Sequence, residues 1–341
     1  MHIISEKSTL ICSLLTSLSL LFMGSLQGDE FTTHISSAEL EREKNRPIPW
    51  LTGPLLAPSG HVLPLGHWNI EPYEFITTNF GRYDHEWHTH PVLHNFYNAN
   101  TQVSTQYGFA RRFDITVTPQ FSWNHTHGAS HWDLNDLPIS LSYQLVYDTV
   151  VNWWPAVKLS FHTSAPIGRY QKLDPNDKGT DVGGSGSWLP GVRLTMSQQY
   201  WWGGNVFFAP RLSFDYTIPT AVHVKGFNAY GGGHHTHGKV IPGQAFSGVF
   251  GFEISVTKRW VLAGDLLYVH ANTTRFKGHR GATAGVPNTI GAPSIDQWSV
   301  APAIEYNWNS SIGMIAGVWF SIAARNSPEF ATAVVALNIY K

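Results

Sequence analysis

Apolar and polar residues alternate with period two in several segments of this chain, and this pattern limits its fold more than any other feature. In the segment 114–124 every second residue is apolar, and 137–147, 191–200 and 205–217 repeat the alternation. Successive side chains of a β-strand point to opposite faces, so the pattern predicts strands with one apolar and one polar face. Pro119 lacks the N–H that a central strand donates, and we expect a bulge there.

The same criterion yields about twelve candidate strands. Each has about ten residues or slightly more, the length that a tilted strand needs to cross a bilayer. The candidates cover 67–80, 101–110, 114–124, 137–147, 154–164, 188–200, 205–217, 245–257, 260–270, 297–306, 310–321 and 330–340.

The connections between these strands differ in length in a regular way. Those after the even-numbered strands are short: 111–113, 148–153, 201–204, 258–259 and 307–309. Those after the odd-numbered strands are mostly long: 81–100, 125–136, 165–187, 218–244 and 271–296, with only 322–329 brief. A β-sandwich or a propeller has no reason to sort its loops in this way. The sequence therefore predicts an all-β fold, an antiparallel transmembrane β-barrel with short periplasmic turns and long extracellular loops.

Composition supports a membrane barrel. Only 13% of the residues are charged, well below the usual ~25%. After residue 23 no stretch reaches 18 apolar residues, and a membrane protein without such a helix must close its strands into a barrel. The net charge of −1 gives no reason to expect a nucleic-acid partner.

Tryptophans cluster near the ends of the expected strands, as in the aromatic girdles at membrane interfaces. Those at the short-turn rim are Trp68, Trp153, Trp154, Trp201, Trp202, Trp260 and Trp308. Those at the long-loop rim are Trp87, Trp123, Trp188 and Trp298.

The first 66 residues do not follow the strand pattern. A lysine-bearing start, an apolar run over 9–23 and small residues after it predict a cleaved signal peptide over 1–28. A spanning helix is the alternative, but the run is shorter than the ~20 residues a span needs. The only cysteine, Cys12, lies in this part. Residues 29–66 are expected to be irregular and could plug the lumen or lie in the periplasm, and 67–341 form the barrel.

The C-terminal part carries a family resemblance. The Gly-containing segment Ile312–Ser321, the Ala-Arg-Asn-Ser link at 324–327 and the ending Phe330–Tyr340 resemble the outer-membrane transporters of the MetA-pathway-of-phenol-degradation family. Residues Leu51–Pro72 resemble uncharacterised barrels of intracellular Gram-negative bacteria. The resemblance implies a barrel that moves small, often apolar molecules, and it carries over no catalytic residues.

The polar phase of the strands predicts which charged side chains line the lumen. Ionisable groups inside a barrel pair with one another or line a water path, so they could set selectivity or only hold the barrel's shape. The candidates are Lys158, Arg193, Arg211, Asp215, Glu253, Asp265 and Glu305.

Histidine is abundant, with 18 in the chain, and three expected loops each contain His-Thr-His. Two histidines at i and i+2 of an extended chain point to the same side, where they could bind Zn²⁺, Cu²⁺ or Ni²⁺. Histidine could equally be an ordinary polar loop residue, and no cofactor is otherwise expected. The candidate metal ligands are His88, His90, His125, His127, His235 and His237.

These features predict a channel or transporter of the bacterial outer membrane for passive passage of small solutes, not an enzyme. Its expected partners are outer-membrane lipid, the barrel-assembly machinery and a small solute. The alternative is a surface-exposed barrel with a closed lumen that acts as an adhesin. A third reading, an outer-membrane hydrolase, needs a serine with a base and an orienting group. His162 and Ser164 face the same side, but the sequence offers no obvious Asn or Asp partner.

Overall fold

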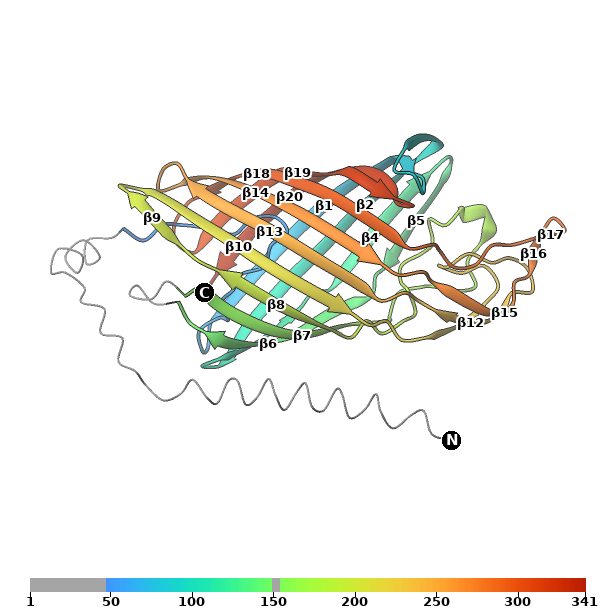
Figure 1. Ribbon diagram of the computed structural model, residues 1–341, viewed down its shortest axis with the longest axis horizontal. Coiled ribbons are helices and arrows are strands. Elements are labelled where there is room, and N and C mark those ends of the chain that lie inside the picture. The colour runs from blue at the N-terminus through green and yellow to red at the C-terminus, as the bar shows by residue number, and fades with distance from the viewer. Residues whose placement is uncertain (1–46, 149–153) are drawn as a thin grey trace. The chain divides into compact units, whose positions relative to one another are not determined.

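The computed structural model describes residues 47–148 and 154–341 (Figure 1). The expected signal peptide at 1–28 and the start of the irregular segment lie outside the described residues. Within the ranges described, no helix combines the length and the apolar character needed to cross a membrane.

The described chain forms a closed antiparallel barrel of twelve strand positions, which confirms the predicted fold class. Chain neighbours pair with each other around the wall, and β1 closes the barrel on β20 with Asn69 opposite Tyr340 and Thr77 opposite Thr332. The positions are β1 (Trp68–Tyr83), β2 (Thr89–Ala110), β3 (Phe113–Val117) continued by β4 (Gln120–Thr126), β6 (Leu137–Val146) preceded by β5 (Ala129–Leu134), β7 (Ala156–Ala165), β8 (Gly191–Ser197) followed by β9 (Tyr200–Gly203), β10 (Val206–Thr217), β13 (Ala245–Ser255), β14 (Trp260–Ala271), β18 (Ile295–Asn307), β19 (Ile312–Arg325) and β20 (Pro328–Tyr340).

The outer surface of the wall is apolar. On β7, Phe161 is 55% exposed whereas its neighbour Ser160 faces inward and is buried. On β1 and β20, Ile76 and Val335 are likewise exposed. A closed ladder leaves no unpaired strand edge, and apolar side chains on its outside suit a hydrocarbon environment.

Pro119 interrupts its strand, but the expected bulge at this residue is not seen, because the register against β2 is the same on both sides of the break. The strand stops at Val117 and resumes at Gln120. The neighbouring strands keep their contacts across the gap, because the N–H of Thr118 donates to Pro138 O and the Pro119 carbonyl accepts from Val103 N, both at 3.0 Å. The barrel stays closed at this point.

Two of the predicted long loops are wrong. Residues 81–100 and 125–136 were expected to be irregular, but β2 begins at Thr89, and β4 and β5 continue almost to the turn at 127–128. These stretches are rich in His and Asn and lack apolar alternation, because they pair beyond the part of the wall with an apolar outer face. Ladder hydrogen bonds and side-chain contacts such as Asn98 to Asn124 (2.7 Å) extend the strands there.

The three remaining long connections form a small structure of their own at the long-loop rim. They contain a 3-10 helix, η1 (Pro175–Asp177), a three-stranded sheet of β11 (Val222–Lys225), β12 (His237–Ile241) and β15 (Arg275–His279), and the hairpin β16 (Ala282–Thr283) with β17 (Val286–Pro287). Val222, Val224, Val240 and Ile290 form its buried apolar cluster. These loops therefore have a fixed conformation.

Candidate functional site

The irregular segment Pro47–Gly66 runs round the inner wall of the barrel near the short-turn rim, and we call it the lumen segment. Its main-chain N–H groups donate to side chains or carbonyls of six wall strands, from β18, β13 and β14 on one side to β6, β3 and β2 on the other. These bonds are Thr52 N to Glu305 Oε2 (3.0 Å, β18), Gly53 N to Glu253 Oε1 (2.8 Å, β13), Leu56 N and Ala57 N to the two oxygens of Asp265 (3.2 and 3.0 Å, β14), Val62 N to Gln144 Oε1 (2.7 Å, β6), Leu63 N to Asp114 Oδ2 (3.0 Å, β3) and Gly66 N to Gly108 O (2.7 Å, β2).

Wall side chains also donate to the carbonyls of the lumen segment. Lys158 Nζ lies 3.2 Å from His61 O, and Arg211 Nη1 lies 3.4 Å from Ala57 O. The ring of His61 bonds in turn to Asp148 Oδ1 at 2.7 Å, in the turn after β6. The segment is thus bound to the wall through both its donors and its acceptors.

The sequence of the lumen segment explains this mode of attachment. Pro54, Pro58 and Pro64 prevent regular structure, so its main-chain groups cannot pair with one another. Unpaired main-chain groups removed from water cost free energy comparable to a lost hydrogen bond. Carboxylates are the strongest acceptors available to them, which accounts for the buried acids on β13, β14 and β18.

Apolar packing adds to these bonds on one side of the barrel. Leu55 is only 5% exposed and contacts the cluster that includes Ala301, Ile315 and Val334 on β18, β19 and β20. Burial of a leucine side chain contributes roughly 1.5–3 kcal/mol. The inner face of β18, β19 and β20 is therefore partly apolar where Leu55 covers it.

Glycines allow the close approach of segment and wall. A Cβ on the inward-facing Gly251 would lie 2.5 Å from the Cβ of Ala57, closer than two carbons can approach. Gly53 has φ +102°, a conformation that side chains disfavour, and its position against the Arg211 guanidinium leaves no room for one.

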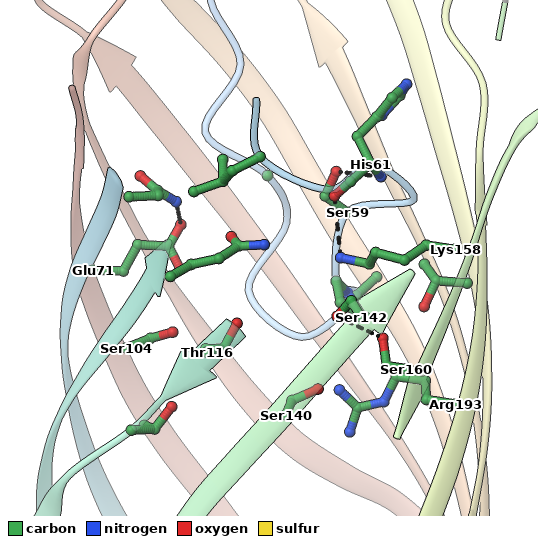
Figure 2. Close-up of a pocket in the computed structure, with 18 of the residues that line it drawn as sticks. Ser59, His61, Glu71, Ser104, Thr116, Ser140, Ser142, Lys158, Ser160 and Arg193 are labelled. Carbon is green, nitrogen blue, oxygen red and sulfur yellow. Dashed lines mark hydrogen bonds between the residues drawn. The ribbon is translucent and has the colours of Figure 1, made fainter. Parts of the chain in front are cut away.

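A cavity of about 840 Å³ remains beside the lumen segment. Its lining reaches from Ser310 and Tyr340 at the short-turn rim to Leu189 and Thr217 near the long-loop rim, so it follows the barrel for most of its length. The stacked rings of Tyr73 and Phe75 on β1 line one part of it. Hydroxyl groups line the strands from β2 to β8, and Figure 2 labels several of them. These hydroxyl residues include Ser104, Thr116, Ser140, Ser142, Ser160 and Thr195.

The seven charged residues expected in the lumen fall into three groups by what they contact. Glu253, Asp265 and Glu305 hold N–H groups of the lumen segment. Lys158 and Arg211 hold its carbonyls, and Arg211 also pairs with Glu253 at 2.8 Å.

The remaining two, Arg193 and Asp215, pair with each other at 2.9 Å beside the cavity. Sequence reasoning missed Asp114, Gln144 and Glu71, which also face inward. The polar phase of their strands was the available signal, but nothing local showed that a distant segment would need their acceptors.

The structure supplies an acidic partner for His162 that the sequence did not reveal. Its Nε2 lies 2.8 Å from Asp215 Oδ2. The same carboxylate oxygen of Asp215 also pairs with Arg193 Nε. Among the described residues no serine hydroxyl bonds to the ring of His162, including Ser164. The pair therefore lacks the nucleophile that a hydrolytic triad requires.

The three His-Thr-His pairs do not converge on one point. His88 and His90 lie at the β1–β2 turn, His125 and His127 at the β4–β5 turn, and His235 and His237 in the loop sheet. Two pairs instead stack on histidines from elsewhere, His127 on His94 (3.7 Å between ring centroids) and His237 on His279 (5.2 Å). His125 stacks on Trp123 and bonds to Ser130.

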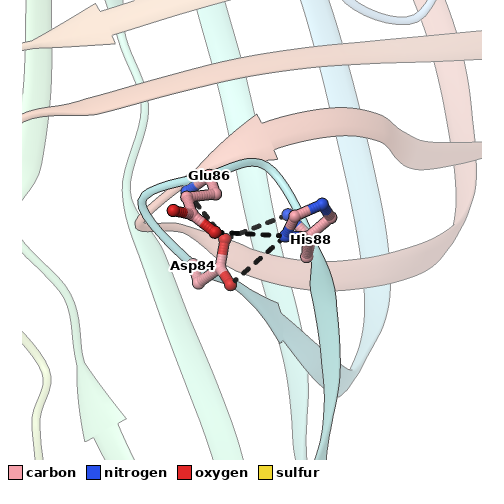
Figure 3. Close-up of side chains that lie close together, drawn as sticks. All are labelled: Asp84, Glu86 and His88. Atoms are coloured by element: carbon pink, nitrogen blue, oxygen red, sulfur yellow. Dashed lines mark hydrogen bonds and ion pairs between the residues drawn. The ribbon is translucent and has the colours of Figure 1, made fainter.

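One exposed cluster at the β1–β2 turn brings possible metal ligands together. Asp84, Glu86 and His88 each place one ligand atom within 4.8 Å of the others (Figure 3). Asp84 also bonds to His90 Nε2 at 2.9 Å and accepts the N–H groups of Glu86 and His88. The His90 contact and these N–H groups lower the pKa of Asp84 to about 2. The carboxylate is charged at neutral pH, and its oxygens already accept hydrogen bonds from groups of the turn.

Loop contacts narrow the long-loop rim. Asp136 accepts the N–H groups of Gly168 (3.0 Å) and Ser185 (2.8 Å), and Tyr230 Oη donates to Ser185 O at 2.8 Å. Burial, reinforced by the charge of Asp136, raises the pKa of Tyr230 to about 12, so the phenol stays a donor. The loop 166–190 is thereby fixed against the barrel.

Comparison with known proteins gives a match in structure only. No family description and no curated protein matches the sequence. The COG4313 outer membrane channel from Pseudomonas putida F1 superposes with a TM-score of 0.65 at 11% identity, over 84% of this chain and all of that one. This confirms the architecture expected from the resemblance to the phenol-degradation transporters.

Two further neighbours are more distant. They are the toluene transporter TbuX from Ralstonia pickettii (TM-score 0.39, 9% identity, 81% of this chain and 90% of that one) and a mutant of the TodX monoaromatic hydrocarbon channel (TM-score 0.39, 13% identity, 81% and 91%).

Proposed function

We propose that the chain is an outer-membrane channel for the passive passage of small solutes, with the lumen segment as its constriction. The observation that carries this proposal is the cavity whose lining extends from Ser310 and Tyr340 to Leu189 and Thr217. A lumen that served only to hold the barrel together would be filled by side chains, as in the smallest barrels. The architectural match to an outer membrane channel agrees with this role.

The proposal includes location and partners. The apolar outer surface would face outer-membrane lipid, the short-turn rim the periplasm and the long-loop rim the exterior. The C-terminal strand β20, which ends at Tyr340, would be read by the barrel-assembly machinery, and residues 1–28 would be removed on export.

The test is single-channel conductance of the refolded chain 29–341 in a planar bilayer. We expect small, regular conductance steps from the intact chain and steps several times larger after deletion of 51–64. Deletion of the β16–β17 hairpin, 282–287, is the matched control and should leave the conductance unchanged. Heat-modifiable gel mobility would verify that each barrel is folded. Folded barrels that conduct neither with nor without 51–64 would contradict the channel.

A closed barrel with a surface-binding role is the second candidate. The ordered loop sheet of β11, β12 and β15 favours it, because a defined exposed surface is what a ligand would recognise. This second candidate predicts no conductance from the intact chain or from the chain that lacks 51–64.

Metal capture is a further part of the proposal, now centred on one turn. The cluster of Asp84, Glu86 and His88 offers two carboxylates and an imidazole, a ligand set that suits Zn²⁺. Isothermal titration with ZnCl₂ should give one site that is lost in His88→Ala and kept in His235→Ala. Equal binding by both variants would remove this turn from the proposal.

A further inference from the structure

A continuous patch of hydroxyls and cations faces the cavity from three neighbouring strands. Strand register places Ser142 of β6 opposite Ser160 of β7, and Ser160 opposite Arg193 of β8. Lys158 lies two residues from Ser160 on the same face of β7. The Ser142 and Ser160 hydroxyls are 2.9 Å apart, and Figure 2 shows the Arg193 guanidinium beside them. Two cations thus flank two hydroxyls at the narrow part of the lumen.

Lys158 lacks an acidic partner. Its side chain is buried, with the residue only 5% exposed, and no carboxylate oxygen of the described residues lies within 4.0 Å of its ammonium. Its hydrogen bond goes to the neutral His61 carbonyl, although an ammonium can donate three. The charges of Asp114 and Glu71 act on Lys158 only from beyond ion-pair distance, and a buried ammonium without a direct ion pair is costly, so the position favours an anion.

Arg193 is only partly neutralised. Its Nε bonds to Asp215, which also receives His162, while the rest of the guanidinium borders the cavity and the side chain is 36% exposed. The two terminal nitrogens of a guanidinium match the geometry of a carboxylate.

The acids near the patch are already engaged. Asp114 accepts from Leu63 and Gln106 through Oδ2, while its buried Oδ1 accepts no hydrogen bond from the described residues. Glu253 binds Arg211 and Gly53. Across the cavity Glu71 accepts from Asn338 and Asn69. These acids do not reach Lys158 or the cavity side of Arg193.

We propose that Lys158, Arg193, Ser142 and Ser160 form a binding site for a small hydroxylated organic carboxylate. The carboxylate pairs with Arg193 and Lys158, and the serines exchange hydrogen bonds with the hydroxyls of the solute. The cavity of about 840 Å³ lies within the usual range for small-molecule sites. The inference rests on the proposed channel and names the solute class that it selects.

The experiment compares three probes of equal size on the refolded chain 29–341. Sodium gluconate, uncharged sorbitol and cationic glucosamine are added in turn to the extracellular side during conductance recording. Gluconate should reduce the KCl current at millimolar concentration, and sorbitol and glucosamine should need at least roughly tenfold more, because a hydrogen-bonded charge pair contributes about that factor. A KCl gradient should give a reversal potential of anion-selective sign.

Three variants test the residues, and the two that remove a charge each have a matched control. Arg193→Gln and Lys158→Met should each weaken gluconate block roughly tenfold and move the reversal potential towards zero. Arg275→Gln and Lys277→Met remove the same charges from exposed positions of β15 and should change neither. Ser142→Ala keeps both cations and should weaken gluconate block without altering the reversal potential.

The outcomes separate this inference from the channel proposal. Conductance with equal block by gluconate and sorbitol, or block unaffected by Arg193→Gln, would overturn the anion site and leave the channel intact. Folded barrels without conductance would overturn the channel. In that case calorimetric titration with gluconate tests the binding site independently of conductance. Binding that Arg193→Gln abolishes would support the site, and an absence of binding would reject it.

Discussion

Asp265 inside the lumen and Asp84 at the β1–β2 turn make the same kind of contact in different surroundings. Each carboxylate accepts two main-chain N–H groups, Asp265 from Leu56 and Ala57 and Asp84 from Glu86 and His88. Asp265 reaches a segment more than 200 residues away and is buried, whereas the bonds of Asp84 span two and four residues and are exposed.

The difference shows how burial sets the energetic weight of identical bonds. Water can replace the carboxylate at the exposed turn, so loss of Asp84 leaves no group without a partner. At the buried Asp265 and Glu253 no equivalent replacement exists, and each lost acceptor leaves N–H groups unpaired in a site of low dielectric constant. We therefore expect mutations of the buried acids to act on the whole barrel and those of the turn to act locally.

The largest effect is expected for Glu253→Gln. The Glu253 side chain is fully buried and binds both Arg211 and Gly53 N, so its replacement removes the direct ion-pair partner of the largely buried Arg211 guanidinium. Breaking a buried pair from one side costs about 3–5 kcal/mol. Urea unfolding in detergent micelles would measure the loss.

Glu86→Gln at the exposed turn is the control for this substitution. It should leave the free energy of unfolding unchanged within error. Equal losses of unfolding free energy in the two variants would show that burial does not determine the effect of the substitution.

Asp265→Asn should have the next largest effect. One amide oxygen replaces two carboxylate oxygens, so either Leu56 N or Ala57 N loses its acceptor, and an unsatisfied buried group costs about 1–3 kcal/mol. The same unfolding measurement would detect it, together with faster hydrogen exchange of the two amides. Asp84→Asn is the matched control, and unchanged exchange in Asp265→Asn would contradict the role of the carboxylate.

The same contrast explains what the sequence could reveal. Strand alternation is a local property, and it predicted the twelve positions and the polar phase that contains Asp265. The partner of Asp265 depends on a segment more than 200 residues earlier that has no regular structure, so no spacing in the sequence encodes that contact. The extended hairpins at Thr89 and Ala129 escaped prediction for a related reason: their pairing depends on the neighbouring strand more than on their own pattern.

Acid should affect the Asp84 turn within a defined pH window. The folded-state pKa of about 2 lies below the ordinary 3.8, so the charged carboxylate stabilises the turn above pH 3.8 and the contribution disappears as the pH falls through 2. The amide signals of Glu86 and His88 should show an acid transition with its midpoint near pH 2, the folded-state value. Asp84→Asn should abolish this transition, and an identical transition in that variant would assign it to another group.

The smallest expected effect concerns the stacked rings of His94 and His127 between neighbouring hairpins. The charge of His94, and secondarily that of Lys178, lowers the pKa of His127 below its ordinary 6.5. A lowered histidine pKa means that the stack is stabilised above pH 6.5 and that this contribution is lost as the pH falls through the lower folded-state value. NMR titration of the His127 ring should therefore show a midpoint below 6.5 that rises in His94→Gln and rises less in Lys178→Met. A midpoint unmoved by His94→Gln would mean that the neighbouring ring contributes no charge there.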